Sequence, residues 1–267
     1  MKFILEKVDY NITNTIFQKI IEEFEKELLD NQKTFEELKK MDLEYNNKKV
    51  TIEDLIEAVE LFKTTKVRSK NMNNIIFYYG NPVVTVQVLF ESIRNGNTAN
   101  LCIENQCLAI NKFIVELFVS ILKDHKIKEC IAFGTYKLKQ VEEDLELFDN
   151  AIFVGNRNLY NMLRDKTTNE KYIPFDCLDI LVFGTKYEDF ARDVLNVAIE
   201  SDIETEIYED MKEDVAVEYL NQYGNKYMIL LLGTNKEKLK SVAEKLNYKY
   251  ILINENPFDK KIPSIIM

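Results

Sequence analysis

Apolar side chains recur at helical spacing in the first part of the chain. Between residues 13 and 40 they fall on one face of a helix, at Ile16, Ile20, Ile21, Phe24, Leu28 and Leu29. Thr13 or Asn14 would cap this helix. A second helix is predicted to begin at Thr51, because Thr51-Ile52-Glu53-Asp54 resembles a capping box with Asp in place of Glu. We therefore expect a helical segment over residues 1–70.

The pattern changes near residue 74 to short apolar runs that alternate with amphipathic stretches. Continuous apolar strands between helices predict a parallel sheet that is covered on both faces and joined by right-handed crossovers. The predicted fold class is therefore α/β, with a doubly wound, mainly parallel, Rossmann-like domain over residues 71–200. Its strands are expected at 74–79, 99–103, 129–133, 151–154 and 178–183, and its helices at 83–94, 109–122, 138–147, 157–163 and 188–199.

The remaining residues, 201–267, predict a smaller α/β segment. Its strands are expected at 207–208, 227–232 and 250–254, and its helices at 212–223 and 236–246. The last residues, 260–267, are partly apolar and too few to fold alone. They would form an edge strand or an arm that reaches another subunit.

Composition excludes two classes of partner. The 267 residues are 46% hydrophobic, which is enough to bury a substantial core. The formal net charge is -10, so no basic surface is expected for nucleic acid. No apolar run approaches the roughly 20 residues that span a bilayer, and the N-terminus lacks leader features. We expect a cytoplasmic protein without a membrane segment.

Four cysteines lack both a C-x-x-C pair and a metal-ligand spacing: Cys102, Cys107, Cys130 and Cys177. Each lies in or beside an apolar stretch, so we expect reduced, buried thiols. A chemical role for Cys102 or Cys177 remains the alternative. The single histidine, His125, is expected in a surface loop, and it excludes mechanisms that need two histidines.

An acidic stretch covers residues 200–206, Glu-Ser-Asp-Ile-Glu-Thr-Glu. Its carboxylates could bind a metal ion, but they lack a neighbouring histidine. We interpret the stretch as a solvated turn and predict no metal site.

The turn Gly80-Asn81-Pro82 follows the first predicted strand. It places a side-chain amide at the mouth of the sheet, where ligands bind in doubly wound folds. This amide could donate a hydrogen bond to an oxyanion. It could equally hold the loop, because strand-to-helix turns favour Asn and Pro for structural reasons.

Three segments together resemble the NAD-binding domain of the aldehyde dehydrogenase superfamily: Gly80-Asn81-Pro82, residues 95–101 (Asn-Gly-Asn-Thr-Ala-Asn-Leu) and residues 149–156 (Asp-Asn-Ala-Ile-Phe-Val-Gly-Asn). They are similar to that family's P-W-N-F-P turn, A-G-N-T-V-V-L-K-P-S-E strand and F-T-G-S turn, in the same order. Residues 260–267 are similar in place to its oligomerisation arm. The resemblance therefore implies a homodimer formed through that arm.

The resemblance also implies roles for individual residues. Asn81 matches the asparagine of the family's oxyanion hole. The dinucleotide, NAD or NADP, would be bound by Tyr79, Gly80, Glu104, Gly155 and Asn156. Cys102 and Asn105 stand where the family has its ribose-binding Lys and Glu, so ribose recognition would need another residue, such as Glu104.

The family's reacting groups have no match. Its E-L-G-G, which carries the general base, would fall near residues 173–176 (Ile-Pro-Phe-Asp), and its G-Q-x-C near residues 203–206 (Ile-Glu-Thr-Glu). A thioester mechanism needs an accessible thiolate as well as an oxyanion donor. Only Asn81, the donor, is present.

Three interpretations of function follow. The first is a catalytically degenerate aldehyde-dehydrogenase-like protein, a pseudoenzyme that binds a ligand or acts as a scaffold. The second is a divergent but active NAD(P)-dependent oxidoreductase on an aldehyde or acyl substrate, with an unrecognised nucleophile or one from a partner chain. The third is a doubly wound domain that binds another small molecule.

Overall fold

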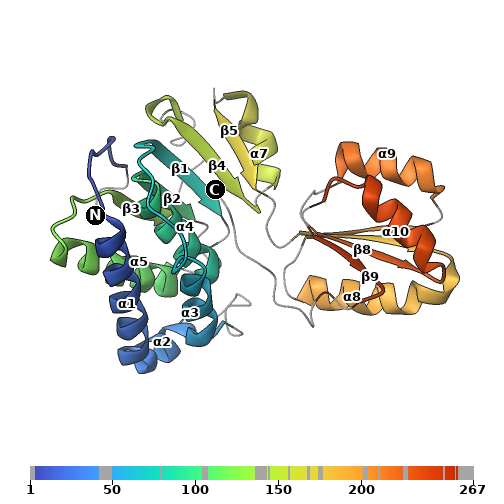
Figure 1. Ribbon diagram of the computed structural model, residues 1–267, viewed down its shortest axis with the longest axis horizontal. Coiled ribbons are helices and arrows are strands. Elements are labelled where there is room, and N and C mark those ends of the chain that lie inside the picture. The colour runs from blue at the N-terminus through green and yellow to red at the C-terminus, as the bar shows by residue number, and fades with distance from the viewer. Residues whose placement is uncertain are drawn as a thin grey trace. The chain divides into compact units, whose positions relative to one another are not determined.

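The chain folds into two compact units (Figure 1). The computed structural model describes residues 4–41, 50–78, 80–103, 108–135, 143, 145–155, 157–166, 169–173, 177–200, 204–209, 211–224, 228–248, 250–255 and 257. Described residues up to Ile173 form one unit and those from Cys177 onward form the other. Each unit contains one parallel sheet, so the fold is α/β as predicted.

The first unit begins with three helices, α1 (Asn14–Asp30), α2 (Gln32–Lys39) and α3 (Ile52–Glu60). Helices α1 and α3 begin at the predicted capping residues. The side chain of Thr13 caps α1, and Thr51 forms a reciprocal capping box with Asp54. The single helix predicted over residues 13–40 is wrong, because the chain breaks at Asn31, whose Nδ2 donates to the carbonyl of Glu27 at 2.9 Å. The N–H of Asn31 also donates to this carbonyl, at 3.1 Å, but the backbone of Asn31 leaves the helical range, with a φ of -105° and a ψ of 17°, and this separates α1 from α2.

The first unit is built on a five-stranded sheet with the order β3-β2-β1-β4-β5, and all of its strand pairs are parallel. Its elements are β1 (Asn73–Tyr78), α4 (Pro82–Arg94), β2 (Thr98–Ile103), α5 (Leu108–Asp124), β3 (Ile131–Thr135), the 3-10 helix η3 (Leu145–Leu147), β4 (Asn150–Val154), α7 (Arg157–Leu163), η4 (Arg164–Lys166) and β5 (Glu170–Ile173). Most of the helix predicted at 138–147 lies outside the described residues.

Helices cover both faces of this sheet. Tyr78 faces α4, where its hydroxyl contacts Thr85. Side chains at alternate positions point the other way, and Phe77 and Phe153 pack against Leu159 of α7. Helices α1 and α3 lie outside α4 and α5 and contact them, so residues 1–70 belong to this unit rather than forming a separate segment.

The second unit has a four-stranded parallel sheet with the order β7-β6-β8-β9. Its elements are β6 (Cys177–Phe183), η5 (Thr185–Tyr187), α8 (Glu188–Glu200), β7 (Glu204–Tyr208), α9 (Glu213–Tyr223), β8 (Met228–Gly233), α10 (Lys236–Lys245) and β9 (Tyr250–Ile253). One sheet face packs on α8 and the other on α9 and α10, which gives this unit a core of its own.

The predicted boundary at residue 200 is wrong. Strand β6 pairs with β7 and β8, with Leu178 beside Thr205 and Met228, so β6 and α8 belong to the second unit. The boundary therefore lies between Ile173 and Cys177. An apolar strand followed by an amphipathic helix has the same pattern in either sheet, and nothing in that pattern identifies the pairing partner.

Two polar segments lie in edge strands and were not predicted as such. Strand β7 contains the predicted residues 207–208 and also residues 204–206, so the interpretation of this part of the acidic stretch as a solvated turn is wrong. Strand β5 was not expected at all. Edge strands are often short and charged, which obscures the apolar signal. Among the described residues, no group of three His, Cys, Asp or Glu side chains could hold a metal ion.

His125 lies in the turn after α5, close to the predicted surface loop, and is partly exposed. Its Nε2 lies 3.0 Å from Glu23 Oε2, so this turn contacts α1. None of the described helices combines the length and apolar character that crossing a membrane requires.

Phe90 of α4 connects the sheet-covering layer to the N-terminal helices. Its fully buried ring lies 5.3 Å from that of Phe24, 5.6 Å from that of Phe62 and 5.0 Å from that of Phe118. Edge-to-face and stacked pairs at these distances stabilise a core beyond their buried area.

Phe90→Ala should therefore lower the free energy of unfolding by about 3–5 kcal/mol, because it leaves a cavity where three helices meet. Urea unfolding followed by circular dichroism measures this change. The control is Leu147→Ala at a side chain that is 62% exposed, which should shift stability by no more than about 0.5 kcal/mol. A similar effect for both variants would contradict the central role of Phe90.

Candidate functional site

The carboxyl edge of the first sheet contains a topological switch point. From β1 the chain proceeds to β2 and β3 on one side, and β4 then pairs with the other side of β1. Ligands of doubly wound folds bind in the crevice that this reversal creates. The register places Tyr78 of β1 beside Val154 of β4, so the turns at Gly80 and Gly155 leave the sheet next to each other.

Both glycines have backbone conformations that other residues rarely adopt. Gly80 has a φ of 87° and Gly155 a φ of 70°. The N–H of Gly155 donates to the carbonyl of Ile173 at 2.9 Å, so it is already used to hold the end of β5. Because Gly155 has no side chain, a ligand could approach its backbone closely.

Asn81 occupies the N-cap position of α4. Its Oδ1 accepts a hydrogen bond from the N–H of Val83 at 2.9 Å, and Pro82 takes the first helical position. The structural role considered for this amide is therefore present. An oxyanion would interact with Nδ2, the donor of the same amide.

A buried hydrogen-bond network of polar side chains fixes the turn at Gly80. The hydroxyl of Tyr78 lies 2.9 Å from Thr85 Oγ1, Thr85 Oγ1 donates to Asn111 Oδ1, and Asn111 Nδ2 donates to the carbonyl of Gly80. Thr85 and Asn111 are fully buried. Because buried polar groups need their partners, this network fixes the turn relative to α4 and α5.

Sequence reasoning missed Thr85 and Asn111. Both helices contain other polar residues, such as Gln87 in α4 and Glu116 in α5, so no signal in the sequence distinguished these two. Among the residues that it did select, the structure brings Gly80, Asn81 and Gly155 together at one edge. Tyr79, Glu104 and Asn156 lie outside the described residues, so their roles remain predictions.

Neither of the two described thiols is exposed at this edge of the sheet. Cys102 is 1% exposed and packs in the core between β1 and α7. Burial raises the pKa of Cys102 well above its usual range, and burial also raises the pKa of Cys130 to about 12. Both thiols are thus protonated at neutral pH. The side chains of Cys107 and Cys177 are not among those described.

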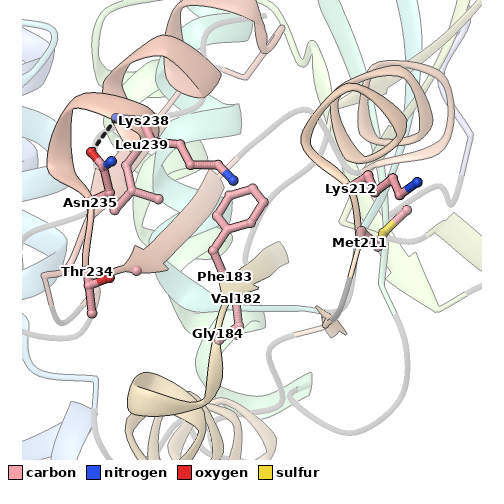
Figure 2. A pocket seen from close by; sticks show the side chains of 10 residues that line it. Val182, Phe183, Gly184, Met211, Lys212, Thr234, Asn235, Lys238 and Leu239 are labelled. Carbon is pink, nitrogen blue, oxygen red and sulfur yellow. Dashed lines mark hydrogen bonds between the residues drawn. The ribbon is translucent and has the colours of Figure 1, made fainter.

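The second unit has a hollow at its own switch point, between the carboxyl ends of β6 and β8 (Figure 2). The cavity measures about 360 Å³ and includes Gly184, Gly233 and Thr234 in its lining. Asn235 caps the adjoining helix α10 by accepting from the N–H of Lys238 at 3.0 Å. Sequence reasoning missed this hollow. The glycines at the ends of two apolar strands are the signal that could have indicated it.

Two lysines give this hollow positive charge. Figure 2 shows the side chain of Lys238 extending over the ring of Phe183, with a distance of 4.7 Å from Nζ to the ring centroid. The same ammonium lies 3.4 Å from Glu213 Oε2, which compensates part of its charge. Lys212 lies across the cavity from it. This setting favours an anionic group over a cationic one.

Comparison with known proteins gives no sequence match but a clear structural one. No protein-family model matches the chain, and no curated protein matches its sequence. The fold matches γ-glutamyl phosphate reductase from Thermotoga maritima, with a TM-score of 0.57 and 17% identity over 92% of this chain and 84% of that one.

Two further solved structures are similar. A glyceraldehyde-3-phosphate dehydrogenase from Methanocaldococcus jannaschii, in complex with NADP, has a TM-score of 0.62 and 10% identity over 94% of this chain and 83% of its own. A probable aldehyde dehydrogenase from Listeria monocytogenes has a TM-score of 0.63 and 7% identity over 92% and 82%.

Structural similarity at such low sequence identity shows the fold and says nothing about the chemistry, which depends on individual residues. It confirms the aldehyde-dehydrogenase-like fold that the sequence predicted. This chain has the fold of the aldehyde dehydrogenase superfamily.

Proposed function

We propose that this aldehyde-dehydrogenase-like protein binds a dinucleotide, NAD or NADP, in the crevice between β1 and β4 and has lost the family's thioester chemistry. The observation that carries the proposal is the adjacency of the Gly80 and Gly155 turns at the switch point. In this proposal, the first unit binds the nucleotide and the second is the reduced counterpart of a catalytic domain. The protein acts as a binding or scaffold protein, with residues 260–267 as the arm of a homodimer.

The residues at the crevice fit part of a dinucleotide. The bare backbone at Gly155 permits a pyrophosphate to approach closely, and the N-terminus of α4 beside Asn81 favours negative charge. The ribose side fits less well, because Cys102 is packed in the core where the family has a lysine. Ribose recognition is therefore assigned to Glu104. A bound NAD or NADP would supply hydride transfer, and this chain's residues would position it.

The protonation state of the described thiols supports the proposed loss of thioester chemistry. An aldehyde-oxidising thioester mechanism requires a thiolate near neutral pH. Both described thiols are buried and protonated there. An oxyanion donor such as Asn81 does not replace a missing nucleophile.

Nucleotide binding can be tested at Gly155. The wild-type protein should release or absorb heat on titration with millimolar NAD or NADP. Gly155→Asn keeps a residue that tolerates positive φ but places a side chain against the pyrophosphate, so affinity should fall at least about tenfold. The matched control is Lys126→Asn, at an exposed turn residue of the first unit whose φ is also positive, at 59°.

The control should keep wild-type affinity within about twofold. Thermal melts of both variants verify that they fold. An absence of any heat or thermal shift with both nucleotides would refute dinucleotide binding and favour another ligand for the crevice. Equal loss in both variants would show that the effect does not come from the β1/β4 crevice.

The thiol state makes a second, independent prediction. In a Cys107→Ser/Cys177→Ser double variant, Cys102 and Cys130 should not react with a disulfide reagent at pH 8 in the native state. Both should react fully in guanidinium, because unfolding removes the burial that raises each pKa. Fast native labelling of Cys102 or Cys130 would contradict the proposed absence of a described nucleophile.

Activity distinguishes the pseudoenzyme from a divergent enzyme. Aldehydes and acyl phosphates incubated with NAD(P) or NAD(P)H should give no change in absorbance at the reduced-nicotinamide band. A rate that appears with the wild type and disappears in Asn81→Ala would instead identify an active oxidoreductase. Asn81→Ala also removes a helix cap, so its stability, expected to fall by about 1 kcal/mol, must be measured alongside.

A further inference from the structure

A polar pocket lies at the opposite edge of the first sheet from the Gly80 and Gly155 turns. Its cavity measures about 170 Å³, between the amino ends of β1 and β4 and the last turn of α4. Asn74 and Asn150, which pair across β1 and β4, line one side, and Glu91 and Asn95 line another. No part of the proposed nucleotide site contributes to it.

Asn95 presents a hydrogen-bond acceptor that has no donor. The residue is 2% exposed, and its Nδ2 donates to Glu91 Oε1 at 2.9 Å. Its Oδ1 is buried and accepts no hydrogen bond from any described residue. Exchanging the amide oxygen and nitrogen would not help, because the carboxylate of Glu91 requires a donor. The pocket therefore lacks a donor that would satisfy Asn95 Oδ1.

Glu91 offers a second acceptor at the same place. It is 2% exposed, and its charge is compensated by Arg94 Nη2. The hydrogen bonds described for Glu91, from Arg94 and Asn95, both end on Oε1. Oε2 therefore remains for a further donor.

Two lysines give the pocket an excess of positive charge. Lys70 and Lys171 contribute to the lining, and neither forms an ion pair with a described carboxylate. Partial burial and the nearby charge of Lys70 lower the pKa of Lys171, whereas the nearby carboxylate of Glu91 raises it. Glu91 is also paired with Arg94, so one carboxylate faces three cations and compensates the repulsion between the two ammonium groups only in part. An anion would relieve this repulsion.

We propose that this pocket binds a small acidic α-amino acid. Its carboxylates would lie between Lys70 and Lys171, and its ammonium group would donate to Asn95 Oδ1 and Glu91 Oε2. A simple anion would leave Asn95 without a donor, and a water molecule there would leave the two lysines with only the shared carboxylate of Glu91 as counterion. The cavity of about 170 Å³ corresponds to roughly six water volumes of ~30 Å³ each, which suits a four-carbon amino acid.

A matched pair of ligands tests the requirement for both charges. L-Aspartate and succinate have the same carbon chain and the same two carboxylates, and they differ in the amino group. In calorimetric titrations of the full chain, L-aspartate should bind at least about tenfold more tightly than succinate, because only the amino group donates to Asn95 and Glu91. Equal affinity would overturn the proposal, as would an absence of binding at 10 mM L-aspartate.

Variants at the rim test the location. Lys70→Gln and Lys171→Gln should each weaken L-aspartate binding at least about tenfold without lowering the melting temperature, since both side chains are exposed at the pocket mouth. Lys33→Gln, on the exposed surface of α2, is the charge-matched control and should bind like the wild type. Unchanged affinity in both rim variants would place the amino acid elsewhere and overturn the proposal.

The proposal is independent of nucleotide binding. Gly155→Asn should keep wild-type affinity for L-aspartate, and the rim variants should keep wild-type affinity for NAD or NADP. Loss of L-aspartate binding in Gly155→Asn would mean that the ligand occupies the carboxyl-edge crevice, which contradicts the assignment to this pocket.

Discussion

The parallel pairing of β1 with both β2 and β4 is the constraint on which both sites of the first unit depend. Because β1 lies between these partners, its carboxyl end brings the Gly80 turn beside Gly155. Its amino end brings Asn74 beside Asn150, and Asn150 Nδ2 donates to Asn74 Oδ1 at 2.8 Å. A shift of this register by one residue would turn Tyr78 away from Thr85 and expose polar groups to the core.

Local structure could be predicted from the sequence where a residue type has a single well-defined structural role. Thr13 and Thr51 cap helices because their hydroxyls accept from free backbone N–H groups. Pairing partners were not predictable in this way, since β6 and β4 are equally apolar but belong to different sheets. Strand β5 was missed because a short edge strand needs apolar contacts on one face only.

The position of the candidate site could be predicted from the sequence, but the interactions among its side chains could not. The resemblance selected Gly80, Asn81 and Gly155, and the fold places them at one edge. It could not select Thr85 or Asn111, whose importance lies in a buried network formed across two helices. Nor could it show that the N–H of Gly155 is already bonded to Ile173. Such facts depend on side chains that meet only after the chain has folded.

The separation of β1 and β4 along the chain has a kinetic consequence. Asn74 and Asn150 are 76 residues apart, so their pairing closes a long loop that already contains β2 and β3. Parallel contacts at such separation form slowly compared with helices and local turns. Formation of the crevice between Gly80 and Gly155 should therefore coincide with the slowest step in folding of the first unit. Until then, the unpaired edge of β1 is exposed and available to another extended chain.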